Sequence, residues 1–260
     1  MNVLRWIICC VVVTMALPSC KSTEVQKVLS AEDRFDLGKQ KFDKGDYLDA
    51  IEQFNIVKVQ FSGSSVGDDA QYYLGECHFK QEEYLLASEE YQTLRRSMPA
   101  SPLVPMAQYK TALCFYMLSP RSPLDQVYTR RAIDEFQAFI EYNPKHELVK
   151  DAEEKIVELN NKLSKKLYDA GRLYVKMEEY KPAIIYFSAV IDKYHDTEFA
   201  EPAYIGKLQA LLALKHYGEA YDEAQKFLQK YPESSYKDDA LGVIKETNDY
   251  LHPNAKEGKP

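Results

Sequence analysis

Five alanines recur in one frame along this chain, and this frame constrains the fold more than any other feature. They are Ala50, Ala87, Ala132, Ala183 and Ala220. Four residues after the alanine, four of the five copies carry an aromatic residue: Phe54, Tyr91, Phe136 and Phe187, with Ala224 in the fifth. Each alanine is also preceded, on the first of the two segments of its repeat, by one further frame position. Four copies have a small residue there, Gly38, Gly75, Ala112 and Gly171, and the fifth has Leu208. A frame repeated at this spacing indicates a stack of helical hairpins.

The frame has a direct physical interpretation. A small residue on the first helix of each hairpin allows the second helix to approach closely, and we expect it to face the alanine. Prolines at Pro99, Pro144 and Pro232 then end the second helix of three hairpins. The pattern resembles the tetratricopeptide repeat, whose period is about 34 residues. The predicted fold is therefore all-α: a right-handed solenoid of about five tetratricopeptide-like hairpins with a C-terminal capping helix.

The predicted organisation follows from helix signals and breakers. Ser30–Asp33 offers a capping box at the start of the first hairpin, and Gly45-Asp46 makes its turn. The third hairpin carries an eight-residue insertion, Ser119–Gln126, between its helices; such loops are commonly contact surfaces. One long helix over 147–176 joins the third hairpin to the fourth. The predicted segments are repeats 1–3 (31–146), repeats 4–5 with the capping helix (147–251), and a disordered polar tail (252–260).

The N-terminus carries the pattern of a secretory leader. Arg5 precedes the apolar run Trp6–Leu17, which is too short to span a bilayer. The end of this run, Leu17-Pro18-Ser19-Cys20, resembles the bacterial lipobox, which implies a signal peptide over 1–19 and lipid attachment to Cys20. The alternative is an ordinary signal peptide that happens to carry a cysteine. Residues 20–30 are interpreted as a tether. In lipoproteins with this box, an Asp directly after the lipid-bearing cysteine often signals retention in the inner membrane. This chain has Lys21 at that position, which favours the outer membrane.

Composition and motifs argue against several classes of function. The formal net charge of -7, without a basic face, makes nucleic acid an unexpected partner. The histidines are scattered and no HExxH, CxxC, GxSxG or Walker motif occurs, so we expect no enzyme, no metal site and no cofactor. Cys77 and Cys114 remain in the mature chain. We expect buried free thiols; a disulfide is the alternative.

An aromatic series on the first helices is the candidate binding surface. It stands three residues before the small residue of each hairpin: Phe35, Tyr72, Tyr109 and Tyr168, with Ile205 in the fifth copy. If part of this series points toward the concave side of the solenoid, it forms a ladder able to hold an extended peptide. The alternative is that these rings pack between the helices.

The order of these features is similar to that of the BamD family, the lipoprotein subunit of the bacterial outer-membrane β-barrel assembly machinery. The supporting residues are Gly45-Asp46-Tyr47 with Ala50-Ile51, the insertion Ser119–Gln126, and Tyr180 with Ala183-Ile184. The resemblance implies a non-enzymatic protein that is lipid-anchored at the periplasmic face of the outer membrane. It implies two partners: a BamA-type barrel protein, and unfolded outer-membrane proteins. The alternative is another periplasmic tetratricopeptide-repeat lipoprotein that coordinates cell-wall synthesis or envelope division.

Overall fold

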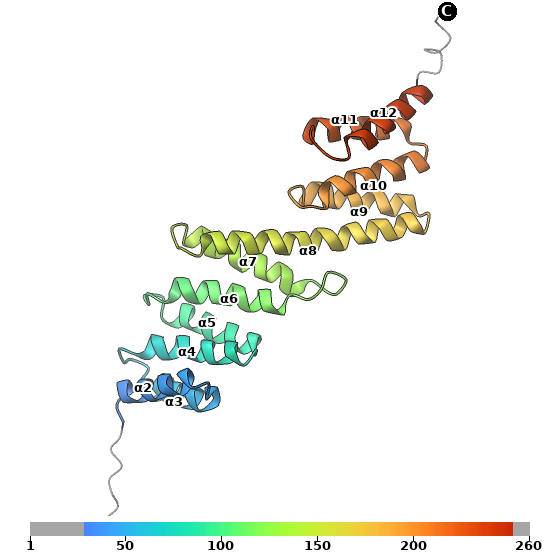
Figure 1. Ribbon diagram of the computed structural model, residues 1–260. Helices are drawn as coiled ribbons and strands as arrows, with labels where there is room; N and C mark the ends of the chain where they lie inside the picture. Colours follow the sequence, from blue (N-terminus) through green and yellow to red (C-terminus); the bar gives the residue numbers. More distant parts are fainter. Residues whose placement is uncertain (1–28, 252–260) are drawn as a thin grey trace, which may run out of the picture.

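The computed structural model describes residues 29–251, and over that range its regular elements are helices only (Figure 1). In chain order they are α2 (Ala31–Asp43), α3 (Tyr47–Gln60), α4 (Gly67–Lys80), α5 (Tyr84–Ser97), α6 (Val104–Leu118), α7 (Val127–Tyr142), α8 (Val149–Lys176), α9 (Tyr180–Lys193), α10 (Ala200–Ala213), α11 (Tyr217–Lys230) and α12 (Lys237–Leu251). The helical solenoid expected from the sequence is confirmed. The predicted signal peptide, Cys20 with most of its tether, and the predicted disordered tail lie outside the described residues.

The helices form five antiparallel hairpins, α2/α3, α4/α5, α6/α7, α8/α9 and α10/α11, and α12 packs on α11 as a cap. The five alanines are completely buried, and so are the apolar residues seven positions after them: Val57, Leu94, Phe139, Val190 and Phe227. The capping box at Ser30 is present, since Ser30 Oγ accepts from Asp33 N at 3.0 Å and Asp33 Oδ2 accepts from Ser30 N at 3.2 Å.

The small residue of the frame has a different neighbour from the one expected. A Cβ added to Gly38 would lie 2.6 Å from a ring carbon of Phe54, and one added to Gly75 would lie 2.5 Å from Tyr91. The glycine therefore makes room for the aromatic ring one turn beyond the alanine, and not for the alanine itself. The fifth hairpin differs from the frame at both of these positions. Its first helix carries the large residue Leu208 and its second helix carries the small residue Ala224, and both are fully buried in one core cluster. The large and the small residue have therefore exchanged helices.

The long helix α8 connects two stacks (Figure 1). It runs for 28 residues. Ala152, Leu159 and Leu163, in its first 15 residues, pack into the core of α6 and α7. Its second half packs Leu167 and Tyr168 into the core that α9, α10 and α11 share. One continuous helix thus belongs to both stacks and contributes to both cores.

Hydrogen bonds from Gln126, the last residue of the insertion Ser119–Gln126, hold the loop between α6 and α7 in place. Gln126 is 1% exposed, and its Nε2 donates to the carbonyl oxygens of Arg121 at 2.9 Å and Leu124 at 3.0 Å. From α8, Lys162 Nζ donates to Ser119 Oγ at 2.8 Å and Lys166 Nζ donates to Leu124 O at 2.7 Å. These bonds hold the loop against the middle of the long helix.

The two cysteines within residues 29–251, Cys77 and Cys114, are free and buried, as expected from the sequence. Burial raises the pKa of the Cys77 thiol and of the Cys114 thiol to about 12. At neutral pH both side chains are therefore protonated and act as small apolar residues of the core.

Four of the turns inside hairpins place one residue in the left-handed region: Gly45 (φ 85°), Glu82 (φ 62°), Glu178 (φ 61°) and Lys215 (φ 60°). In each turn the next N–H closes the bond of a Schellman motif; Glu179 N, for example, donates to Tyr174 O at 2.9 Å. Only the first turn uses glycine, so the other three carry backbone strain.

Replacing Glu178 with Gly is therefore expected to raise the free energy of unfolding by about 0.5–1 kcal/mol, because the relief of strain exceeds the entropy that glycine adds to the unfolded chain. Urea unfolding followed by circular dichroism measures the change. Glu179→Gly is the control, since Glu179 has φ -91° and gains nothing from glycine. Equal or opposite shifts for the two variants would contradict the strain assigned to Glu178.

Candidate functional site

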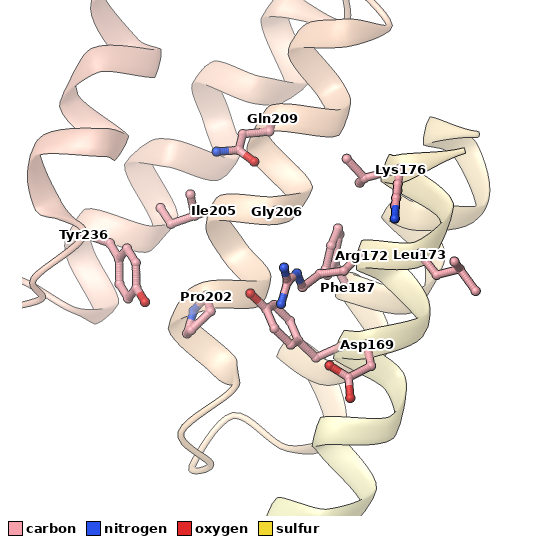
Figure 2. A pocket seen from close by; sticks show the side chains of 12 residues that line it. Asp169, Arg172, Leu173, Lys176, Phe187, Pro202, Ile205, Gly206, Gln209 and Tyr236 are labelled. Carbon is pink, nitrogen blue, oxygen red and sulfur yellow. The ribbon is translucent and has the colours of Figure 1, made fainter. Parts of the chain in front are cut away.

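A groove between α8 and α10 is the candidate binding site in the described part of the chain. Its volume is about 560 Å³. Figure 2 shows Arg172 and Lys176 on α8, Ile205, Gly206 and Gln209 on α10, and Tyr236 just before α12 around this space. The groove therefore lies on the first helices of hairpins 4 and 5, where α8 and α10 contact each other directly.

Two glycines allow this close approach. A Cβ on Gly206 of α10 would lie 2.6 Å from a ring carbon of Phe187, and one on Gly171 of α8 would lie 2.7 Å from the same ring. Phe187 on α9 is thus held between two neighbouring first helices and forms the apolar floor of the groove. Sequence reasoning found Gly171 through the frame but missed Gly206, which lies two residues before the frame position that Leu208 occupies.

The rim of the groove carries more positive than negative charge. Arg172 and Lys176 line it with Asp169 as the acidic residue. The Arg172 guanidinium lies 5.8 Å from the centre of the Tyr168 ring. Burial raises the pKa of Tyr168, while the charge of Arg172 opposes that shift, so this phenol stays protonated at neutral pH. The arrangement provides an apolar floor, a neutral hydroxyl and two cations, which suits an acidic or acceptor-rich peptide segment.

The end of the groove is held by contacts from the last loop. Ser234 Oγ donates to the carboxylate of Glu201 at the start of α10, and Ser234 Oγ accepts from Tyr236 N at 3.0 Å. These bonds place Tyr236 opposite α8 (Figure 2). Sequence reasoning did not single out Arg172, Lys176 or Tyr236, since nothing in the pattern separates them from other surface residues.

The structure places each predicted ladder aromatic against the ring of its own hairpin. The ring centres lie 5.7 Å apart for Phe35–Phe54, 5.6 Å for Tyr72–Tyr91, 5.8 Å for Tyr109–Phe136 and 5.9 Å for Tyr168–Phe187. Tyr109 is 7% exposed and donates its hydroxyl to Asp151. Tyr168 and Ile205 also line the groove. Packing inside the hairpin thus accounts for all four aromatic rings, and peptide binding by Phe35, Tyr72 or Tyr109 stays a prediction.

Other kinds of site find little support in the described residues. Between residues 29 and 251, no three or more His, Cys, Asp or Glu side chains are placed to hold a metal ion. No helix in that range has both the length and the apolar sequence needed to cross a membrane.

The stacked hairpins and their glycine–aromatic packing define a tetratricopeptide-type helical repeat protein. Similar solved structures include the TPR2AB domain of yeast Sti1 in its complex with pHSP90 (13% identity, 87% of this chain and 95% of that chain, TM-score 0.42). A thermophilic TPR protein from Thermus thermophilus matches at 15% identity over 85% of this chain and 99% of that chain, with a TM-score of 0.36. At these identities the likeness concerns the fold alone.

The YfiO family, described as an outer membrane lipoprotein family, matches residues 29–217, and the chain belongs to it. Among curated relatives, the outer membrane protein assembly factor BamD of Rickettsia prowazekii (strain Madrid E) is 26% identical over 240 residues, covering 90% of this chain and 94% of the relative. The BamD of Caulobacter vibrioides is 23% identical over 212 residues, covering 80% of this chain and 70% of the relative. These relatives favour the assembly family over the cell-wall alternative.

Proposed function

We propose that this chain is a non-enzymatic assembly factor of the outer membrane, which binds a BamA-type barrel subunit and helps insert β-barrel proteins. The matched family and the BamD relatives support the assembly role. The observation that carries the binding role is the groove between α8 and α10, with its apolar floor and its two cations.

The groove has the properties of a protein-binding site. Its walls are helices, which hold side chains more rigidly than loops do. An apolar floor at Phe187 and Ile205 offers burial to a partner side chain, and Arg172 can form a charge-assisted pair at the rim. We therefore assign the barrel subunit to this groove on the C-terminal half.

The N-terminal hairpins are proposed to receive the unfolded outer-membrane proteins. A helix of 28 residues is about 42 Å long, so α8 would separate the two activities by a fixed distance. Phe35 and Tyr72 are partly exposed and are the ladder rings proposed for the substrate surface, whereas Tyr109 is 7% exposed and offers a partner little area. Cys20 is proposed to carry the lipid that holds the solenoid at the periplasmic face of the outer membrane.

Reversing the charge of the groove is the direct test of partner binding. The double variant Arg172→Glu with Lys176→Glu is expected to lower recovery of the BamA-type barrel by about tenfold or more, since a like charge opposes an acidic partner group. Affinity purification from solubilised membranes, with quantitative identification of the partners, measures the recovery.

Lys150→Glu is the matched control, because Lys150 lies on the same helix, its side chain is 86% exposed, and it is remote from the groove. Unchanged recovery with the double variant would remove the groove from the partner interface. Recovery of cell-wall enzymes in place of the barrel would favour the alternative function.

A further inference from the structure

A second pocket, on hairpins 2 and 3, contains a buried hydrogen-bond donor that lacks an acceptor. The pocket has a volume of about 520 Å³ and lies between the end of α5, the start of α6 and the end of α7. The lining residues that matter here are Arg95, Arg96, Gln108, Glu135, Tyr142 and Asn143. We refer to it as the Gln108 pocket.

Only the oxygen of the Gln108 side-chain amide has a hydrogen-bond partner. The residue is 3% exposed, and its Oε1 accepts from Asn143 Nδ2 at 3.2 Å. Its Nε2 is buried and finds no hydrogen-bond partner anywhere in residues 29–251. Buried donors in folded proteins are almost always satisfied, so an unpaired one in a pocket wall leaves a bonding position open to an acceptor from outside the chain.

The preceding repeats show which bond is missing. Gln108 lies four residues before the small residue Ala112, and Gln71 has the same place before Gly75. Gln71 Nε2 donates to the carboxylate of Glu90, which stands three residues after Ala87. In the first repeat, the residues at the same two places are also joined: Arg34 Nη1 donates to Gln53 Oε1 at 2.9 Å.

In the third repeat the corresponding carboxylate is directed elsewhere. Glu135, three residues after Ala132, pairs with Arg95 Nη1 at 3.2 Å. The second repeat has the equivalent ion pair, Lys58 Nζ with Glu90 Oε2 at 2.7 Å. There, however, the Glu90 carboxylate also accepts a hydrogen bond from Gln71 Nε2. Glu135 thus occupies the place of Glu90, but Gln108 Nε2 lacks the carboxylate acceptor that Gln71 Nε2 has.

We propose that the Gln108 pocket binds a carboxylate from an acidic side chain of a partner polypeptide. That carboxylate would accept from Gln108 Nε2, as the Glu90 carboxylate accepts from Gln71. It would also meet the guanidinium groups of Arg95 and Arg96, which bind planar carboxylates through charge-assisted hydrogen bonds. The Arg96 side chain is 60% exposed, and its Nη2 pairs with Oε1 of Glu89, which is 62% exposed, at 2.6 Å. An incoming anion therefore reaches Arg96 without unfolding the repeat and competes there with a solvent-exposed partner.

The rim of the pocket favours a polypeptide over a phosphate-bearing lipid surface. Tyr142 lines the pocket and is 73% exposed, so its ring is free to cover the apolar part of a bound side chain. The group that fills the equivalent place in the second repeat is itself a carboxylate. The site lies on hairpins 2 and 3, apart from the α8–α10 groove, and the proposal does not depend on the barrel partner.

Binding of two matched peptides tests the proposal on the full mature chain carrying Cys20→Ala. Acetylated hexaglutamate is the probe and acetylated hexaglutamine is its neutral counterpart, with affinity measured by calorimetry at low ionic strength. Hexaglutamate is expected to bind about tenfold or more tightly than hexaglutamine, and Arg96→Ala is expected to remove most of that difference. Glu135→Ala, which frees Arg95 from its internal partner, is expected to strengthen hexaglutamate binding about threefold.

Arg121→Ala is the matched control, because it removes an exposed arginine from the insertion loop, outside the pocket. It is expected to leave the affinity within about twofold. Thermal unfolding of each variant verifies that the fold is retained. Equal binding of the two peptides, or hexaglutamate binding that is insensitive to Arg96→Ala, would overturn the proposal. Binding of phosphatidylglycerol vesicles that requires Arg96, without hexaglutamate binding, would overturn it in favour of a membrane contact.

Discussion

Replacing Phe187 with Ala is expected to lower the free energy of unfolding by about 3–5 kcal/mol, the range for truncation of a buried aromatic residue. Phe187 is 1% exposed and lies against Gly171 of α8 and Gly206 of α10. Neither glycine has a side chain that could move into the vacated space, so a cavity would remain between three helices. The variant also removes the floor of the groove.

Urea unfolding followed by circular dichroism measures this loss. Ile185→Ala on the same helix is the control: Ile185 is 69% exposed, and its truncation is expected to change stability by less than about 0.5 kcal/mol. A loss below about 1 kcal/mol for Phe187→Ala would show that α8 and α10 can collapse onto each other, which the two glycine contacts argue against.

Replacing Cys20 with Ala is expected to release the mature chain from membranes completely. The lipobox-like pattern predicts a lipid on Cys20, and each buried methylene of an acyl chain contributes about 0.8 kcal/mol to membrane binding. The measurement is the distribution of the protein between membrane and soluble fractions, after a urea wash that removes proteins held only by partners.

Cys9→Ala is the control for this experiment, because it removes a cysteine from the same leader without changing the lipobox. The mass of the mature N-terminus provides a second, independent measurement of the lipid. If the Cys20→Ala chain stays with washed membranes as the unaltered chain does, the N-terminus is an ordinary signal peptide and the anchor lies elsewhere.

The fold was largely predictable because the repeat is a local pattern. Helix ends follow from capping and breaking residues, such as Ser30 and the prolines, whose effects extend over only a few positions. The long helix followed from unbroken apolar periodicity, and the structure has it as α8 (Val149–Lys176). The burial of all five frame alanines was predictable for the same reason.

The sites were much less predictable, because they depend on which helices become neighbours. The ladder aromatics were candidates for a groove; the structure packs each against the ring of its own hairpin, and Tyr168 also lines the α8–α10 groove. Gly206, Arg172 and Tyr236 come from three separate segments, and only the stacking of α8, α10 and the loop before α12 brings them together.

The sequence by itself determined the class of fold, the number of hairpins and the place of the insertion, since these follow from periodic spacing along one chain. Only the tertiary structure decided that the frame glycines accommodate rings and not alanines. It alone decided that Leu208 and Ala224 exchange roles within one core, and that Gln108 lacks the acceptor that Gln71 has. The physical reason is that such contacts join side chains from different helices, and their geometry depends on how closely the helices approach.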